Sequence, residues 1–296
     1  MSRRTRIVLI ILGVLAVFLI LPVVLLSTAL CHHGKRSGDV AILTIEGDIL
    51  DPQETLEEVT ELRKNDEVKA VIVRIDSPGG SVGASQEIYE SLLKLKESKK
   101  LVASMGTVAA SGGYYVALPA HKIVANRGTI TGSIGVRMEL VNVENLMHWA
   151  QLKSETLKSG KMKDVGSATR PMTEEERTYL NQLLAELHQQ FKQAVVEQRH
   201  LSSAQVDELA DGRVFTGETA VKNGLIDSLG NLDEAVRVAG ELAGVKGEPQ
   251  VFSVSDQNKK WWQYLIEGAV KNIAGVLIKQ SGVPSYQFLT NGSHLI

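Results

Sequence analysis

The sequence predicts an α/β fold with a mostly parallel sheet flanked by helices. Strand-like and helix-like stretches alternate from Lys35 onward, the pattern of a parallel sheet covered by helices. The chain of 296 residues is long enough for one large α/β domain or two small ones. Its 44% hydrophobic and 22% charged residues exclude collagen-like and wholly disordered proteins. The balance of 32 basic against 34 acidic residues argues against a nucleic-acid protein.

The individual elements follow from hydrophobic periodicity. The expected strands are Val40–Ile45, Val68–Ile75, Leu101–Met105, Lys122–Ala125 and Glu155–Leu157, and the helices between them are Thr55–Asn65, Ala84–Glu97 and Val143–Gln151. Thr173 followed by Glu176 is the capping-box pattern, which predicts a long helix from there to about Arg199. Short helices are expected at Ser203–Ala210 and Gly217–Asn223.

The N-terminal part carries a membrane signal. Ile7–Leu30 contains no charged residue and would span about 36 Å as a helix, more than the hydrocarbon core of a bilayer. Arg3, Arg4 and Arg6 precede it, so the positive-inside rule places residues 1–6 in the cytoplasm and the rest of the chain across the membrane. A cleaved signal peptide is the alternative, but the apolar stretch is longer than usual and lacks a small-x-small cleavage site.

The sole cysteine excludes an intrachain disulfide. Cys31 also cannot form a zinc cluster, and His32 and His33 are interpreted as part of a solvated linker over residues 31–38. We therefore expect no metal and no cofactor. Near the other end, Lys259–Lys279 has the pattern of an amphipathic helix, which could pack on its own domain, on another subunit or on a membrane surface.

Two glycine-rich segments carry the candidate chemistry. Asp76-Ser77-Pro78-Gly79-Gly80 follows a buried strand, and its backbone N–H groups could form an oxyanion hole. Ser111 lies among small residues after the third strand, at the expected start of a helix whose free amides would favour negative charge on an attacked carbonyl. Each segment alone is also typical of an ordinary turn or helix cap.

Together these segments resemble the signal peptide peptidase A, or protease IV, family, which is related in fold to Clp protease and the crotonases. The resemblance covers about residues 38–245. The matching motifs, in the family order, are DSPGG at Asp76–Gly80, ASGGYYVA at Ala110–Ala117, TGSIGV at Thr131–Val136 and KSGKMKD at Lys158–Asp164.

The resemblance implies a serine peptidase with a Ser/Lys dyad. Ser111 matches the nucleophile, Lys163 the general base and Ser133 the residue that holds the lysine amine. A lysine that titrates near 10.4 in water can act as a base near neutral pH if burial disfavours its ammonium form, so Lys163 would need a dry pocket. Amides around Gly79, Gly80 and Gly112 are the expected oxyanion donors.

The resulting interpretation is a membrane-anchored endopeptidase of a bacterial-type cytoplasmic membrane. Its domain would cover residues 39–245, followed by a C-terminal strand and helix extension over residues 246–296. The substrates would be released signal peptides and other short hydrophobic peptides on the extracytoplasmic side. The family also implies a homo-oligomer in which Ser111 and Lys163 come from neighbouring subunits, with the apolar face of Trp262–Leu277 as a candidate contact.

Four alternatives stay open at this point. Gly79-Gly80-Ser81-Val82-Gly83 fits the G-x-S-x-G motif, which would make Ser81 the nucleophile of an α/β-hydrolase, but only two strands precede it. Ser91 and Lys94 fit S-x-x-K without the companion motifs. The fold could also serve a non-proteolytic membrane scaffold, or acyl-CoA chemistry of the crotonase type, which the compartment disfavours.

Overall fold

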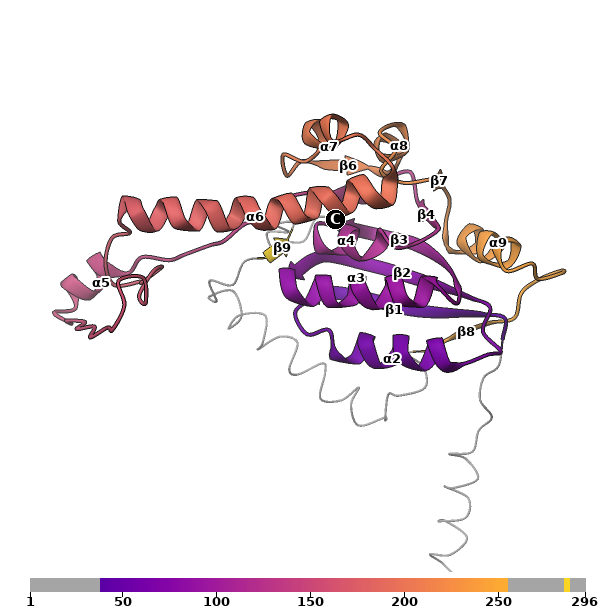
Figure 1. Ribbon diagram of the computed structural model, residues 1–296, viewed down its shortest axis with the longest axis horizontal. Coiled ribbons are helices and arrows are strands. Elements are labelled where there is room, and N and C mark those ends of the chain that lie inside the picture. Colours follow the sequence, from indigo (N-terminus) through magenta and orange to yellow (C-terminus); the bar gives the residue numbers. More distant parts are fainter. Residues whose placement is uncertain (1–37, 255–284, 288–296) are drawn as a thin grey trace, which may run out of the picture. The chain divides into compact units, whose positions relative to one another are not determined.

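Three long parallel strands form the centre of the sheet. They are β1 (Val40–Ile49), β2 (Ala70–Ser81) and β3 (Lys100–Ala110), with β2 in the middle. The structure is a computed structural model and describes residues 38–254 and 285–287. Helices flank this sheet (Figure 1), so the predicted mixed α/β architecture is confirmed.

Shorter strands extend the sheet on both sides. The order is β6-β5-β3-β2-β1-β8, and β4 pairs with β3 and β7. Only the pairs β5–β6 and β2–β9 are antiparallel in the described part of the chain. The bounds are β4 Lys122–Ala125, β5 Ile130–Gly132, β6 Val214–Thr216, β7 Ser228–Leu229, β8 Val251–Ser253 and β9 Ser285–Gln287.

Both faces of β2 are buried, which explains its nearly uninterrupted apolar sequence. Val71, Val73 and Ile75 point into the larger core, whereas Ala70 and Ile72 point into the smaller one. The larger core is covered by α2 (Gln53–Lys64), α3 (Val82–Lys96) and α4 (Gly112–Ala117), and the smaller by α9 (Leu232–Leu242). The sheet is therefore the middle layer of three.

The long helix α6 (Glu174–Arg199) begins at the predicted capping box. Thr173 Oγ1 accepts from the Glu176 amide, and the Glu176 side chain accepts from the Thr173 amide. The C-terminal half of α6 joins the larger core through buried Phe191 and Val195. Arg199 anchors its end by pairing with Asp227 at 3.0 Å. The helices α7 (Ser203–Leu209) and α8 (Gly217–Lys222) follow.

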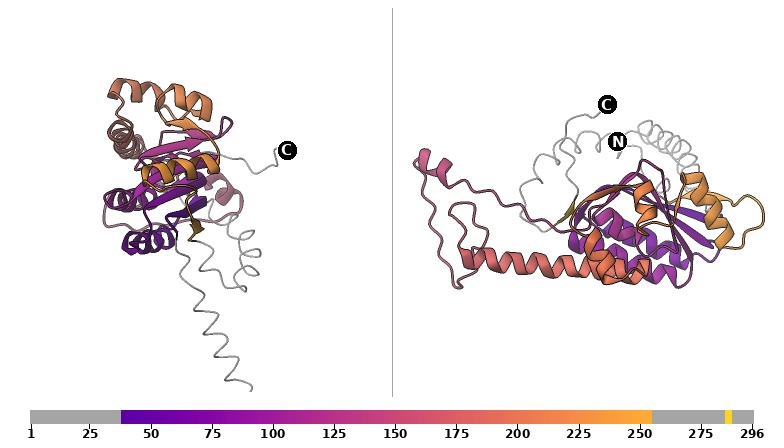
Figure 2. Two further views of the ribbon diagram at one scale, coloured as in Figure 1. Left: turned by 90° about the vertical axis from the view of Figure 1, so that its right-hand side faces the viewer. Right: turned by 90° about the horizontal axis from the view of Figure 1, so that it is seen from above.

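Residues 138–173, here called the arm, make up most of the segment between β5 and α6. The arm contains no buried residue. Its helix α5 (Glu144–Trp149) lies near the N-terminal end of α6 and away from the sheet in Figures 1 and 2. The strand predicted at Glu155–Leu157 is wrong, because no strand of the described residues pairs with this segment and Leu157 is 93% exposed. The sequence analysis also missed β5 and β6, which have three residues each, and α9, although the apolar residues of α9 do recur at helical spacing.

The predicted membrane span lies outside the described residues, as do Cys31, the paired histidines and Lys259–Lys279. Within the described ranges, every helix is too short or too polar to cross a bilayer.

A buried carboxyl on α2 makes the stability of the fold depend on pH. Burial of Glu58, together with the charges of Glu54 and Glu61, raises its pKa from 4.5 to about 7. The folded state therefore binds more protons than the unfolded state between these values, and stability falls as the pH rises through this interval.

We expect Glu58→Gln to raise the free energy of unfolding at pH 8 by about 1 to 3 kcal/mol, because one pKa unit corresponds to about 1.4 kcal/mol. At pH 4.5 the substitution should have little effect, since the carboxyl is then largely protonated in the folded state. Urea unfolding at both pH values measures this. The exposed Glu57, which accepts from Gln53 Nε2, provides the control Glu57→Gln. An equal effect of Glu58→Gln at both pH values would contradict the assignment.

Candidate active site

Ser111 occupies the turn between β3 and α4 in an unusual backbone conformation. Its φ is 55° and its ψ is −119°, which a non-glycine residue adopts only when its surroundings impose it. The Ser111 amide donates to the Gly132 carbonyl at 2.8 Å, and the Ser111 carbonyl accepts from the Tyr115 amide at 2.9 Å. These two bonds hold the residue from both sides, and such strain is concentrated at functional sites.

The Ser111 side chain is 1% exposed, and its Oγ has no hydrogen-bond partner within the described residues. A buried hydroxyl without a partner normally costs about 1 to 3 kcal/mol. Ser111 is thus both strained and buried, and its hydroxyl has no hydrogen-bond partner among the described residues.

Close backbone contact brings the Gly79–Gly80 loop beside this turn. A Cβ added to Gly112 would lie 3.2 Å from both Gly79 Cα and Gly80 N, and 2.6 Å from Ser85 Oγ. A Cβ on Gly80 would lie 2.0 Å from the Ile49 carbonyl oxygen. Both positions therefore require glycine, and the two predicted oxyanion segments meet in space.

The three predicted oxyanion glycines differ in how free their amides are. The Gly79 amide donates to Ser77 Oγ at 3.1 Å within the loop, and the Ser77 side chain is fully buried. This bond holds the loop in shape and occupies the Gly79 donor. Gly80 is paired with Ile49 and Tyr286 in the sheet, whereas Gly112 is the first residue of α4, where the amide has no partner within the helix.

Ser133 lies close to Ser111 in the fold. It follows Gly132, whose carbonyl accepts from the Ser111 amide, and it too has a positive φ, of 51°. Its amide donates to the Arg213 carbonyl at 2.8 Å, and its side chain is buried. Ser111 and Ser133 are therefore neighbours at the carboxyl ends of the paired strands β3 and β5.

Lys163 is not brought to this site within one chain. It lies on the arm, in a turn where its amide donates to the Gly160 carbonyl at 3.1 Å, and its side chain is exposed. The segment that joins α5 to α6 is well separated from α4 in Figure 1. The dry pocket that sequence reasoning required for this lysine is therefore absent from the described part of a single subunit.

Ion pairs between charged side chains nevertheless hold the turn that carries Lys163 in place. Arg170 Nε donates to Asp164 Oδ2 at 2.9 Å, and Arg170 Nη1 donates to Glu176 Oε2 at 2.9 Å. Hydrogen bonds from Arg170 and Lys158 hold the pKa of Asp164 well below its usual range. Lys158 pairs with Asp164, and Lys161 pairs with Glu175. Among the described residues, Lys163 Nζ has no such partner, so the arm presents this amine to solvent.

The alternative nucleophiles lack comparable surroundings. Ser81 is the N-cap of α3 with an ordinary φ of −60°, and Ser91 lies inside the same helix. The sequence analysis did not single out Ser77 or Ser85. Ser77 Oγ accepts from the Gly79 amide, and Ser85 Oγ donates to the Ser81 carbonyl. The close spacing of serines and glycines in this segment was the only available signal.

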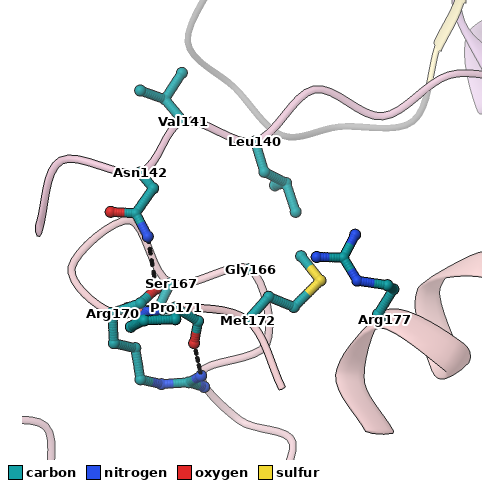
Figure 3. A pocket seen from close by; sticks show the side chains of 9 residues that line it. All are labelled: Leu140, Val141, Asn142, Gly166, Ser167, Arg170, Pro171, Met172 and Arg177. Atoms are coloured by element: carbon teal, nitrogen blue, oxygen red, sulfur yellow. Dashed lines mark hydrogen bonds between the residues drawn. The ribbon is translucent and has the colours of Figure 1, made fainter. Parts of the chain in front are cut away.

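A hollow of about 320 Å³ lies on the arm (Figure 3). Its lining comprises Leu140, Val141, Asn142, Gly166, Ser167, Arg170, Pro171, Met172 and Arg177. None of the predicted catalytic residues lines this hollow. Among the described residues, no three His, Cys, Asp or Glu side chains group as metal ligands.

Comparison with known proteins gives the family. Residues 93–246 match the model of peptidase family S49. The chain is 39% identical over 220 residues to MJ0651 of Methanocaldococcus jannaschii, which is named as a protease, and the match covers 73% of this chain and 71% of that protein. It is 36% identical over 223 residues to Protease 4 of Salmonella typhi, covering 72% of this chain and 36% of the relative.

A third relative is the chloroplastic serine protease SPPA of Arabidopsis thaliana, 35% identical over 213 residues, with 72% of this chain and 32% of the relative covered. The chain thus matches about a third of the length of Protease 4 and of SPPA. From the family model and these identities, the chain belongs to peptidase family S49, the signal peptide peptidase A family, and is a serine-type peptidase.

Proposed function

We propose that the chain is a membrane-anchored serine endopeptidase that degrades released signal peptides and other short hydrophobic peptides, with Ser111 as nucleophile and Lys163 as general base. The observation that carries the proposal is the strained, buried Ser111 beside two glycine backbones. A serine in this position has close backbone neighbours and a hydroxyl free to react, which is what acyl transfer requires.

The pairing of β9 with β2 supports a peptide as the substrate. The extended segment Ser285–Gln287 lies antiparallel to Gly79–Ser81, the end of β2 next to Ser111 and beyond its pairing with β3. This end of β2 therefore accepts an extended backbone, as proteins that bind peptides by strand addition do. A substrate that took the place of Ser285–Gln287 would have its peptide carbonyl close to the Ser111 turn.

The proposed reaction proceeds in two halves. Ser111 Oγ attacks the substrate carbonyl carbon while Lys163 Nζ accepts the hydroxyl proton, and the Gly80 and Gly112 amides stabilise the oxyanion. The C–N bond then breaks, and Lys163 returns the proton to the leaving amine. Lys163 then takes a proton from water, which attacks the acyl carbon, and it gives this proton to Ser111 Oγ as the acyl C–O bond breaks, so that both residues return to their starting states.

We further propose that Lys163 acts on Ser111 of a neighbouring subunit. One chain leaves Ser111 Oγ buried without a partner and leaves Lys163 exposed on the arm. The arm also exposes large apolar side chains, among them Leu146 at 61%, Trp149 at 83% and Leu157 at 93%. Apolar surface of this kind is typical of a subunit contact, and covering it would place the lysine in the drier surroundings that a neutral amine needs.

The membrane location rests on the sequence alone. The uncharged stretch Ile7–Leu30 and the preceding arginines support a single-pass anchor with the peptidase domain on the extracytoplasmic side.

The β3–Ser111–α4 turn beside the Gly79–Gly80 segment supports the proposed likeness to the Clp protease and crotonase folds.

Replacing the nucleophile tests the assignment of Ser111. We expect Ser111→Ala to lower the rate of peptide hydrolysis by about a thousandfold or more, since nucleophile and base act as a unit. Ser81→Ala should stay within about twofold of the wild type, because the Ser81 side chain makes no capping bond. Hydrolysis of a fluorogenic hydrophobic peptide measures both. An inactive Ser81→Ala with an active Ser111→Ala would instead favour the α/β-hydrolase mechanism.

Mixing inactive subunits tests the shared site. Ser111→Ala and Lys163→Ala should each be inactive alone, whereas an equal mixture that is unfolded and refolded together should recover up to about a quarter of wild-type activity, because some interfaces pair an intact serine with an intact lysine. Refolded wild-type protein is the control for yield. A fully active monomer in sedimentation experiments, or no recovery with an active control, would refute the shared dyad.

The role of Ser133 can be separated from its backbone geometry. We expect Ser133→Ala to reduce kcat by about tenfold to a hundredfold, less than substitution of the dyad, because an orienting hydroxyl makes no bond to substrate. Ser133→Gly should lose the same activity although glycine relieves the positive φ. If both variants keep wild-type kcat and differ only in thermal stability, Ser133 is a turn residue.

A further inference from the structure

An irregular stretch of β3 precedes the Ser111 turn. Ile75 of β2 pairs with Met105 of β3, but Ser77 pairs with Ala109, so the interval of two residues on β2 faces an interval of four on β3. The bulge at residues 106–108 interrupts the ladder and leaves its backbone groups to find other partners.

The side chain of Asp76 supplies two of those partners. Its Oδ1 accepts from the Val108 amide at 3.0 Å, and its Oδ2 accepts from the Thr107 amide at 3.2 Å. The carboxylate fits because residue 106 is glycine: a Cβ there would lie 2.5 Å from Asp76 Oδ2. One side chain thus replaces the missing ladder bonds on the β2 side of the bulge.

Two threonines complete the support from the β5 side. Thr129 Oγ1 donates to the Gly106 carbonyl at 2.6 Å, and Thr131 Oγ1 donates to the Ala109 carbonyl at 2.7 Å. These side chains add to the backbone pairing of Val108–Ala110 with β5, and Asp76 provides the charged contacts among them.

We propose that Asp76 is a positioning residue that sets the distance between Ser111 and the oxyanion loop. Asp76 directly precedes Ser77–Gly80 in the chain, while the amides it binds precede Ser111 by only three and four residues. A single carboxylate therefore ties the loop that carries the oxyanion donors to the strand that carries the nucleophile. The inference rests on the proposed role of Ser111 and adds a residue to that machinery.

The chemistry of the contact explains why a carboxylate is needed. Two converging N–H donors require two acceptor atoms, and both oxygens of an ionised Asp accept. An asparagine of the same shape offers one oxygen, and its NH₂ group would face the second amide. A shift of about 1 Å in the position of a nucleophile can cost about a hundredfold in rate, so a small relaxation of the bulge is measurable.

The test compares Asp76→Asn with Gly106→Ala, whose added Cβ displaces the carboxylate without changing residue 76. For each variant we would measure kcat, KM, thermal unfolding, hydrogen exchange at the Thr107 and Val108 amides, and the rate at which a fluorophosphonate labels Ser111. We expect kcat and the labelling rate to fall about tenfold to a hundredfold, with KM within about twofold. The double variant should be no worse than the poorer single variant, since both act through one carboxylate.

Asn231→Ala is the control for a purely structural loss. Asn231 Oδ1 accepts from the Glu234 amide as the N-cap of α9, so its removal lowers stability without touching the bulge. The proposal is overturned if Asp76→Asn speeds exchange at the two amides but leaves kcat and labelling unchanged, or if Asn231→Ala at an equal loss of thermal stability lowers kcat as much. If Asp76→Asn does not fold, Gly106→Ala decides by the same criteria. A wild-type protein that neither hydrolyses peptides nor labels at Ser111 would refute the proposed function itself.

Discussion

The hydrogen bond between the Ser111 amide and the Gly132 carbonyl joins the ends of strands β3 and β5. Each of these strands is followed by a serine with positive φ, Ser111 after β3 and Ser133 after β5. Ser111 and Ser133 can keep these costly conformations only because the paired strands β3 and β5 position the turns that follow them. The carboxyl ends of parallel strands are where open α/β sheets usually place their ligands. The hydroxyl of Ser111, the proposed nucleophile, thus derives its position from two buried, paired strands.

The close approach of the Gly79–Gly80 segment to the Ser111 turn requires glycine. The backbones at Gly80 and Gly112 approach more closely than any side chain would allow, and the Ser77 hydroxyl and the Asp76 carboxylate hold the surrounding loop and bulge in place. The family motifs around Asp76 and Ser111, which are 35 positions apart in the chain, are therefore two sides of one contact. Preorganised backbone donors of this kind are usually the largest single contribution to catalysis of acyl transfer.

The arm contrasts with this rigid centre. Its apolar side chains have no cover in the described chain, and its charged network fixes a turn that presents Lys163 to solvent. A catalytic centre divided in this way would be active only after assembly, which would limit uncontrolled proteolysis by single subunits.

The sequence by itself determined the alternation of strands and helices, the capping box at Thr173 and the family motifs, because each of these depends on residues close together in the chain. It could not exclude a strand at Glu155–Leu157 or foresee β5, because a strand of three residues exists only when a neighbour pairs with it. Only the tertiary structure decided that the Gly79 amide is already engaged, that Asp76 accepts from two amides of β3, and that the segment joining α5 to α6 lies away from α4. These facts are long-range distances between backbones and side chains, and local sequence patterns carry no information about such distances.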